Sequence, residues 1–161
     1  MEDFQFDIQN VEAAQLKTGD CILYENWTIR VLENKISKTG KHGHMKCTIE
    51  GRSLRSNRKV LIMLAGHMMV RRTNVINKSY NIMFTRLEEK PNNDGSTDVH
   101  FDAFDENFDE PLTFTLELDA NELSVINKIR HQNDEYELHI MAFPTIEYED
   151  INTYIKFTKV I

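Results

Sequence analysis

Cysteine is scarce in this chain of 161 residues, which contains only Cys21 and Cys47. Two cysteines are too few for the disulfide framework of a small secreted domain. Each lies in a segment with a strand pattern, so we expect both to be small buried residues. A zinc site built from Cys47, His42 and His44 would lack an obvious fourth ligand beside a glycine-flanked turn, so we predict no metal centre.

Long hydrophobic runs are also missing. No apolar run approaches the roughly 20 residues that a membrane-spanning helix needs, and Met1–Gln5 lacks the basic and apolar regions of a secretory signal. We therefore expect a cytoplasmic protein without a membrane partner. The hydrophobic content of 40% can support one ordinary domain or two small ones.

The sequence contains no recognisable catalytic motif. It has no phosphate-binding glycine-rich motif, no nucleophile elbow and no HExxH pattern. Acidic residues are abundant, but their linear order pairs none of them with a base in a known active-site pattern. We therefore predict that the protein is not an enzyme and needs no catalytic cofactor, although folding could assemble a composite site.

Charge is unevenly distributed along the chain. Residues 1–78 contain 13 Lys/Arg and 8 Asp/Glu, a net of +5, whereas residues 79–161 contain 6 and 18, a net of -12. These values sum to the overall -7 and suggest two domains with different partners. Between Lys35 and Arg72, Glu50 is the single acidic residue, whereas ten residues are basic. The basic residues are Lys35, Lys38, Lys41, Lys46, Arg52, Arg55, Arg58, Lys59, Arg71 and Arg72. Such a stretch favours a polyanion such as RNA, and a solvated basic face is the alternative.

A basic β-hairpin is predicted in the first third of the chain. Thr28–Glu33 and Met45–Glu50 carry β-branched and apolar residues with partial period-two alternation. Gly40 and Gly43 bracket the turn between them, and glycine adopts positive φ without steric cost. The pattern therefore places Lys41 at the apex of a long, positively charged arm.

The pattern of short segments predicts two β domains. Residues 1–14 are polar and acidic without a clear period, so we expect a loose N-terminal tail. Residues 15–78 contain short strands separated by turns, which predicts a small all-β barrel. Residues 79–161 form the second domain.

Strands and one helix are expected in the second domain. Strand patterns cover Tyr80–Phe84, Leu112–Leu118, Glu135–Met141 and Tyr154–Phe157. Asp119 and Glu122 have the spacing of a capping box, and Leu123, Ile126 and Ile129 follow with a helical period. A barrel of five strands with one interposed helix is typical of the oligonucleotide/oligosaccharide-binding (OB) fold.

An acidic, turn-rich stretch near residues 92–111 interrupts these patterns. It begins at Asn92–Gly95, and its acidic residues surround three phenylalanines: Asp98, Asp102, Asp105, Glu106, Asp109 and Glu110 around Phe101, Phe104 and Phe108. We interpret the stretch as an insertion whose negative charge repels RNA. A solvated loop with phenylalanines packed on the barrel and a protein-binding segment are both compatible with this composition.

The hairpin sequence resembles a known family. The run Ser37–His44, followed by Lys46, is similar to the hypusine loop of eukaryotic and archaeal translation initiation factor five-A, a relative of bacterial elongation factor P. Lys41 falls on the lysine that this family converts to hypusine. The match extends back through Leu16–Leu23 and Thr28–Glu33. It extends forward, more loosely, through Arg58, Lys59, His67, Met69 and Asn77, whereas Gly66–Asn77 lacks the family's usual proline.

The resemblance implies a fold and a function. The expected fold is mainly β, with an SH3-like barrel in residues 15–78 and an OB-fold barrel with one short helix in residues 79–161. The expected partners are the ribosome near its exit site, peptidyl-tRNA, and the deoxyhypusine synthase and hydroxylase that build hypusine from spermidine. Such a factor would relieve stalls at consecutive prolines and aid termination.

The resemblance also implies roles for individual residues. Lys41 would carry the modification, and Gly40 and Gly43 would shape the loop. The residues expected to contact RNA, the ribosome or the modifying enzymes are Lys38, Thr39, His42, His44, Lys46, Arg58 and Lys59. Two alternatives stay open: an RNA-binding paralogue without hypusine, and a protein-interaction adaptor that uses the acidic segment.

Overall fold

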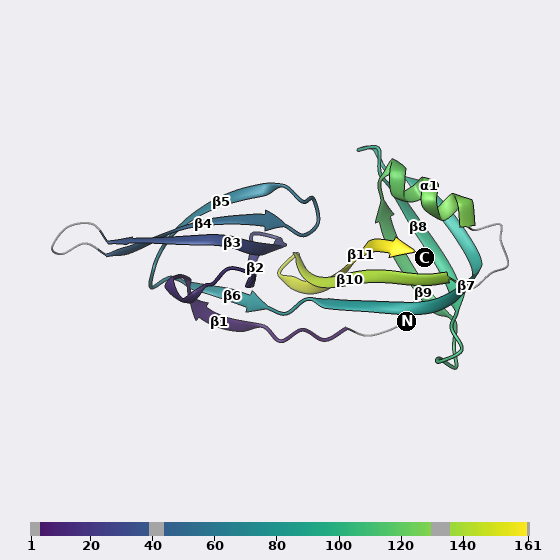
Figure 1. Ribbon diagram of the computed structural model, residues 1–161, viewed down its shortest axis with the longest axis horizontal. Helices are drawn as coiled ribbons and strands as arrows, with labels where there is room; N and C mark the ends of the chain where they lie inside the picture. The colour runs from purple at the N-terminus through teal and green to yellow at the C-terminus, as the bar shows by residue number, and fades with distance from the viewer. Residues whose placement is uncertain (1–3, 39–43, 130–135, 161) are drawn as a thin grey trace. The chain divides into compact units, whose positions relative to one another are not determined.

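The computed structural model describes residues 4–38, 44–129 and 136–160. These residues are mainly β, with one α-helix and one short 3-10 helix among them, which confirms the predicted fold class (Figure 1). Its elements fall into two compact units. One consists of Gln5–Val75 with Phe143–Tyr154, and the other consists mostly of Ile76–Ala142 with Ile155–Ile161.

The N-terminal unit contains a six-stranded antiparallel sheet. Its elements are β1 (Gln9–Glu12), the 3-10 helix η1 (Ala13–Gln15), β2 (Cys21–Tyr24), β3 (Trp27–Lys38), β4 (Met45–Ser53), β5 (Lys59–Ala65) and β6 (Met69–Thr73). The strand order is β1-β6-β2-β3-β4-β5. The predicted hairpin is confirmed, because β3 and β4 pair from Ile29 and Ser53 out to Lys38 and Met45.

The expected loose tail is partly wrong. Gln9–Glu12 forms strand β1 and pairs with Met69–Arg72 of β6, and the following Ala13 is fully buried. The polar composition of this segment suggested a tail. Its conformation is instead set by pairing with β6, which lies some 60 positions later along the chain. Such a long-range pairing leaves no pattern in the local sequence.

A small apolar core fills the N-terminal unit. It consists of Ala13, Leu16, Ile22, Ile29, Val31, Cys47, Ile49 and Ile62. Gly51 lies where β4 crosses this core, and a Cβ there would approach Ile29 Cγ2 to 2.5 Å. Glycine is therefore required at this point by the close approach of the neighbouring strand.

Residues of a late hairpin complete the same unit. The buried Thr28 hydroxyl donates a hydrogen bond to the Pro144 carbonyl at 2.6 Å, and the Ile146 amide donates to Asn26 O at 3.0 Å. Trp27 and Tyr154 meet edge to face with ring centroids 5.5 Å apart. Residues 143–154 thus belong to the N-terminal unit despite their position in the sequence.

The second unit is built on a five-stranded sheet. Its elements are β7 (Ile76–Pro91), β8 (Thr97–Phe104), β9 (Leu112–Leu118), α1 (Ala120–Ile129), β10 (Tyr136–Glu147) and β11 (Asp150–Val160), with sheet order β11-β10-β7-β8-β9. The predicted strand Leu112–Leu118 matches β9 and buries every second residue. Its leucines and Phe114 pack with Tyr80, Ile82 and Leu138 in the core.

The predicted capping box begins helix α1. The Asp119 amide donates to Glu122 Oε1 at 3.1 Å, and the Glu122 amide donates to Asp119 Oδ1 at 2.8 Å. This reciprocal pair satisfies two backbone donors that a helix start leaves open. Ile126 is buried against the core, as the helical spacing predicted.

The central part of the stretch near residues 92–111 is a strand and not the solvated loop that its composition suggested. Thr97–Phe104 forms β8, which lies between β7 and β9 and pairs with both. Thr97, Val99, Phe101 and Ala103 are buried, and the intervening residues face outward. Acidic residues at the outward positions gave the segment a loop-like composition, although its period is that of a strand.

Candidate nucleic-acid interface

The β3–β4 hairpin holds the basic arm. The last described pair is Lys38 opposite Met45, and the preceding pair is Ser37 opposite Lys46. Thr39, Gly40, Lys41, His42 and Gly43 lie outside the described residues. The segment that contains Lys41 therefore joins two strands that are hydrogen-bonded to each other up to its ends.

The alternation of side chains along the two strands places the lysines of the hairpin on opposite faces. Residues opposite each other in a sheet share a face, and neighbours along a strand point to opposite faces. Lys38 therefore shares a face with Met45, whereas Lys46 shares the other face with Ser37. All four side chains are exposed. The structure thus distributes the predicted contact residues over two surfaces of one arm.

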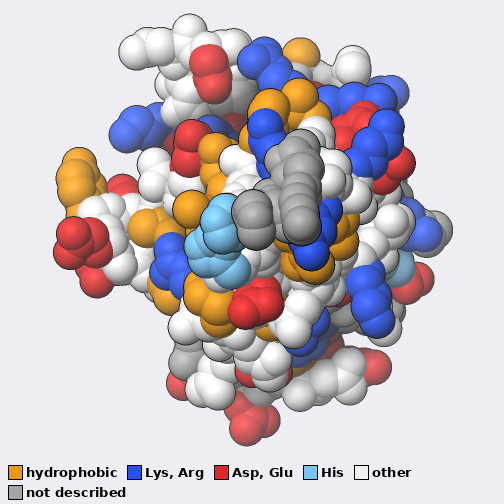
Figure 2. Space-filling view, turned by 90° about the vertical axis from the view of Figure 1, so that its left-hand side faces the viewer, with side chains coloured by type: hydrophobic (Ala, Val, Ile, Leu, Met, Phe, Trp, Pro, Cys, Tyr) orange, Lys and Arg blue, Asp and Glu red, His pale blue; other side chains and the backbone are white. Residues whose placement is uncertain are grey.

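A hollow of about 350 Å³ opens on the Lys38 face. Its lining brings together Lys38, His44 and His67 with Glu12 and the small residues Ala14 and Gly66 beside Met45. The rings of His44 and His67 lie 6.4 Å apart between centroids. Histidine side chains gather in one patch at this end of the molecule, with Lys and Arg nearby (Figure 2). The hollow therefore combines two histidines and a lysine, all of which can donate hydrogen bonds to an anion.

Backbone hydrogen bonds fix the base of this hollow. The Gly66 amide donates to Met45 O at 2.8 Å, and the Ala14 amide donates to Gly66 O at 3.1 Å. A Cβ at Gly66 would lie 2.7 Å from Met45 Cβ. Glycine therefore permits η1 and the β5–β6 turn to close on the arm.

Asn34 supports the arm from inside the unit. Its Nδ2 donates to Ala13 O at 2.9 Å and to Leu16 O at 3.1 Å. These bonds join β3 to η1 and the chain after it. Substitution of this side chain would leave both carbonyls without this donor.

Arg58 and Lys59 lie at the other end of the sheet. Lys59 begins β5 opposite Arg52, which follows Lys46 by six positions along β4. At about 3.3 Å per residue, this separation is roughly 20 Å. Lys59 also forms an exposed salt bridge with Glu50 at 3.2 Å. The structure therefore does not bring these two residues to the hairpin tip.

Residues 7–67 match a family model described as "Translation initiation factor 5A-like, N-terminal". The match covers less than half of the chain. The matched range contains η1, strands β1 to β5, and the segment that carries Lys41.

Two solved structures resemble the chain over nearly its whole length. A translation initiation factor eif-5a family protein from Naegleria fowleri is 18% identical, with a TM-score of 0.62, and the match covers 95% of this chain and 97% of that one. Eukaryotic translation initiation factor 5A from Methanococcus jannaschii is 14% identical, with a TM-score of 0.57 and coverages of 96% and 95%. These likenesses confirm the predicted fold of two β domains. No curated protein matches the chain.

Cys21 and Cys47 are free and buried, as predicted. Burial raises the pKa of the Cys47 thiol, and a hydrogen bond with Asn34 partly offsets this effect. Burial also raises the pKa of Cys21, partly offset by the Arg30 guanidinium. Both thiols therefore favour the protonated form, which is the less reactive one.

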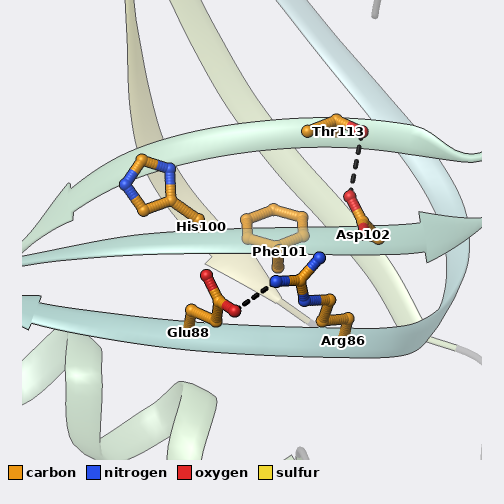
Figure 3. A pocket seen from close by; sticks show the side chains of 6 residues that line it. All are labelled: Arg86, Glu88, His100, Phe101, Asp102 and Thr113. Atoms are coloured by element: carbon orange, nitrogen blue, oxygen red, sulfur yellow. Dashed lines mark hydrogen bonds and ion pairs between the residues drawn. The ribbon is translucent and has the colours of Figure 1, made fainter.

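The outward face of β7, β8 and β9 carries a second hollow, of about 310 Å³ (Figure 3). Arg86 and Glu88 form an ion pair, and the Thr113 hydroxyl donates to Asp102 Oδ1 at 2.9 Å. Thr115 Oγ1 lies 2.6 Å from His100 Nδ1. The Arg86–Glu88 pair lies along β7, whereas the other two contacts join β8 to β9.

The phenylalanines of the acidic segment have different environments. Phe101 is buried in the core, and Phe108 packs against Tyr80 with ring centroids 6.0 Å apart. Asp105 is also buried and accepts hydrogen bonds from the Asn107 amide and side chain. Phe104 is 53% exposed. A deletion of residues 93–110 would remove strand β8, which pairs with both β7 and β9. Point substitutions are therefore the better test of the adaptor alternative, because they leave this strand in place.

Among the residues that the structure describes, no group of three or more His, Cys, Asp or Glu side chains is arranged to hold a metal ion. No helix in the same residues has the length and apolar character to cross a membrane.

Sequence patterns did not predict the contribution of His67 and Glu12 to the Lys38 hollow. The two residues lie 55 positions apart, and they meet because β1 pairs with β6. The loose match of His67 to the family was the one signal that could have drawn attention to it. Long-range pairing of this kind leaves no local period.

Proposed function

We propose that the chain is a translation factor that binds the ribosome near the exit site and positions the acceptor end of peptidyl-tRNA with a hypusine at Lys41. In this proposal it promotes elongation through stalls, such as those at consecutive prolines, and also termination. It acts in the cytoplasm, without a membrane partner and without catalysing a reaction itself.

One observation carries this proposal: Lys41 lies inside the range that matches the 5A-like family, on the segment that joins the paired strands β3 and β4. Strands β3 and β4 pair as far as Lys38 and Met45, so hydrogen-bonded backbone holds both ends of that segment. The arm bears Lys38 and Lys46 on its two faces, which suits an approach to phosphate groups from either side.

The modification would extend the reach of the arm. Deoxyhypusine synthase would transfer the aminobutyl group of spermidine to the Lys41 amine and release 1,3-diaminopropane. The hydroxylase would then insert an oxygen atom from molecular oxygen to complete hypusine. The side chain becomes longer and gains a second amine, so it can donate more hydrogen bonds at a greater distance from the hairpin. The modification alters Lys41 alone and requires no chemical change in any of the described residues.

The modified side chain would act by positioning. Peptide transfer requires the ester carbonyl and the attacking amine in near-attack geometry, and a misplacement of about 1 Å can cost on the order of a hundredfold in rate. A polycationic side chain that holds the acceptor end restores this geometry. The factor then speeds the reaction without chemistry of its own.

Neighbouring residues would divide the remaining contacts. Lys38, Thr39, His42, His44 and Lys46 are near enough in sequence to Lys41 to contact the same RNA or the modifying enzymes. Arg58 and Lys59 lie roughly 20 Å along the sheet from Lys46. They therefore require a different segment of the partner.

The decisive variant is Lys41→Arg, which keeps one charge but cannot be converted to hypusine. In a reconstituted translation assay with a polyproline template, we expect this variant to lose rescue while its circular dichroism and melting temperature stay unchanged. Full rescue by the variant would refute the role of hypusine. It would favour the alternative of an RNA-binding paralogue without the modification.

A further inference from the structure

Three cations stand in one row across the outer face of the N-terminal sheet. Arg30 of β3 is directly opposite Arg52 of β4, and Arg52 is directly opposite Lys59 of β5. Strands in a sheet are about 4.8 Å apart, so each of these charges has a like charge directly opposite it on a neighbouring strand. Such pairs destabilise a sheet. The arrangement therefore needs a reason other than folding.

Few acidic groups offset this row. Lys59 pairs with Glu50 at 3.2 Å, and among the described residues Arg30 and Arg52 form no ion pair. The next row along the same face places Glu33 opposite Glu50. Asp20 also lies near Arg30, because it precedes Cys21, which is opposite Arg30 on β2. Of the acidic residues in the next row, Glu50 is already paired with Lys59.

The turn before β5 holds part of the cluster in place. Arg52 Nη1 donates to Asn57 O at 2.8 Å, and the Ser53 amide donates to Arg58 O at 2.9 Å. Arg58 is therefore exposed on a hydrogen-bonded turn rather than on a free loop. Arg55 of the same turn behaves differently, because its guanidinium lies 4.2 Å above the Trp27 ring. Arg55 has a packing role, whereas the side chains of Arg30, Arg58 and Lys59 are exposed.

We propose that Arg30, Arg52, Arg58 and Lys59, here called the basic row, form a second RNA-phosphate site, separate from the hairpin tip. This inference deepens the proposed function and rests on it for the choice of RNA. A line of cations spaced by the strand separation suits the regular charge of a phosphodiester backbone, which repeats every few ångströms. With about 20 Å between the row and Lys46, one extended RNA or two separate segments could occupy both.

The test compares two variants of the full-length chain that lose the same charge. In the row variant, Arg30→Gln is combined with Lys59→Gln. Arg52 is left intact because it also holds the turn. In the control, Lys17→Gln is combined with Lys159→Gln, two exposed lysines outside the row. Fluorescence anisotropy follows binding of a labelled single-stranded RNA of about 12 nucleotides, a length within the usual site sizes.

The basic row predicts a selective loss. At about 50 mM salt, the row variant should bind on the order of tenfold more weakly, and the slope of log K against log salt should fall by about 1.4, or 0.7 for each lost phosphate contact. The control should bind within about twofold of the unchanged protein, because long-range charge alone is a weaker effect at this salt. Circular dichroism should show both variants folded.

Three results would overturn the inference. Equal losses in both variants would mean diffuse electrostatic binding, and no loss in either would mean that the row does not contact RNA. The same anisotropy assay can be run with a labelled polyglutamate peptide. If the row variant lost binding to this peptide but kept its binding to RNA, the surface would be assigned to an acidic peptide. The assay uses unmodified protein, so it can succeed even if Lys41 proves to carry no hypusine. It can also fail while Lys41→Arg abolishes polyproline rescue.

Discussion

Lys38 and Lys46 lie on opposite faces of the β3–β4 hairpin, although both belong to its basic arm. Lys38 is opposite Met45 and lines the hollow with His44 and His67, whereas Lys46 is opposite Ser37 on the outer face. Two lysines that share an arm therefore do not share an environment. Any partner that contacts both must pass around the edge of the hairpin or use two segments.

This relationship predicts additive effects. Groups without shared contacts contribute independently, so the free-energy losses of Lys38→Gln and Lys46→Gln in RNA binding should sum in the double variant to within about 0.5 kcal/mol. A double-mutant cycle measured by anisotropy on the three proteins tests this directly. A coupling energy above about 1 kcal/mol would show that one ligand group contacts both lysines at once.

Strong local periods made much of the fold predictable. The alternation of Leu112–Leu118 and the Asp119–Glu122 pair gave a strand and a helix start that the structure confirms. Strands β1 and β8 were missed for different reasons. β1 is defined by pairing with β6, and β8 carries acidic residues such as Asp98 and Asp102 at its outward positions.

The candidate site was less predictable than the fold. Its cations could be named from the sequence, but their faces depend on strand register, which includes an irregularity between Val31 and Glu33. Without that register, neither the separation of Lys38 from Lys46 nor the opposition of Arg30 and Arg52 follows. A one-residue shift would exchange the two faces.

The buried hydroxyl of Thr28 should matter for stability. Thr28 is 0% exposed and donates to Pro144 O, so Thr28→Val keeps the shape but leaves a buried carbonyl without its donor. We expect a loss of about 1–3 kcal/mol in the free energy of unfolding, measured by urea denaturation.

Thr145→Val is the matched control for Thr28→Val. The Thr145 hydroxyl donates to Asn26 O in an exposed position, and the Ile146 amide donates to the same carbonyl. Water and the amide can both replace the lost hydroxyl, so this variant should lose less than about 0.5 kcal/mol. Equal losses in the two variants would contradict the role assigned to burial.

Tyr80 should make the fold sensitive to alkali. Burial, and then the charge of Asp105, raises the pKa of Tyr80 to about 12. An unfolded tyrosine titrates near 10, so above that pH the unfolded state releases the proton first. Stability from this group is therefore fully present below about pH 10 and is lost as the pH rises towards 12, by roughly 2–3 kcal/mol.

Replacing Tyr80 separates the effect of its titration on stability from the effects of other groups that titrate at alkaline pH. Tyr80→Phe should show a shallower fall of unfolding free energy between pH 10 and 12 than the unchanged protein, whatever its starting stability. Tyr148→Phe is the control, because Tyr148 is 93% exposed. Parallel pH profiles for all three proteins would show that Tyr80 is not the group responsible.

A peptide mass spectrum of protein purified from its own cells reports the chemical state of Lys41. We expect the mass of an added aminohydroxybutyl group on the peptide that contains Lys41, with fragment ions that place it on that residue. An unmodified Lys41 throughout the sample would contradict the proposed mechanism.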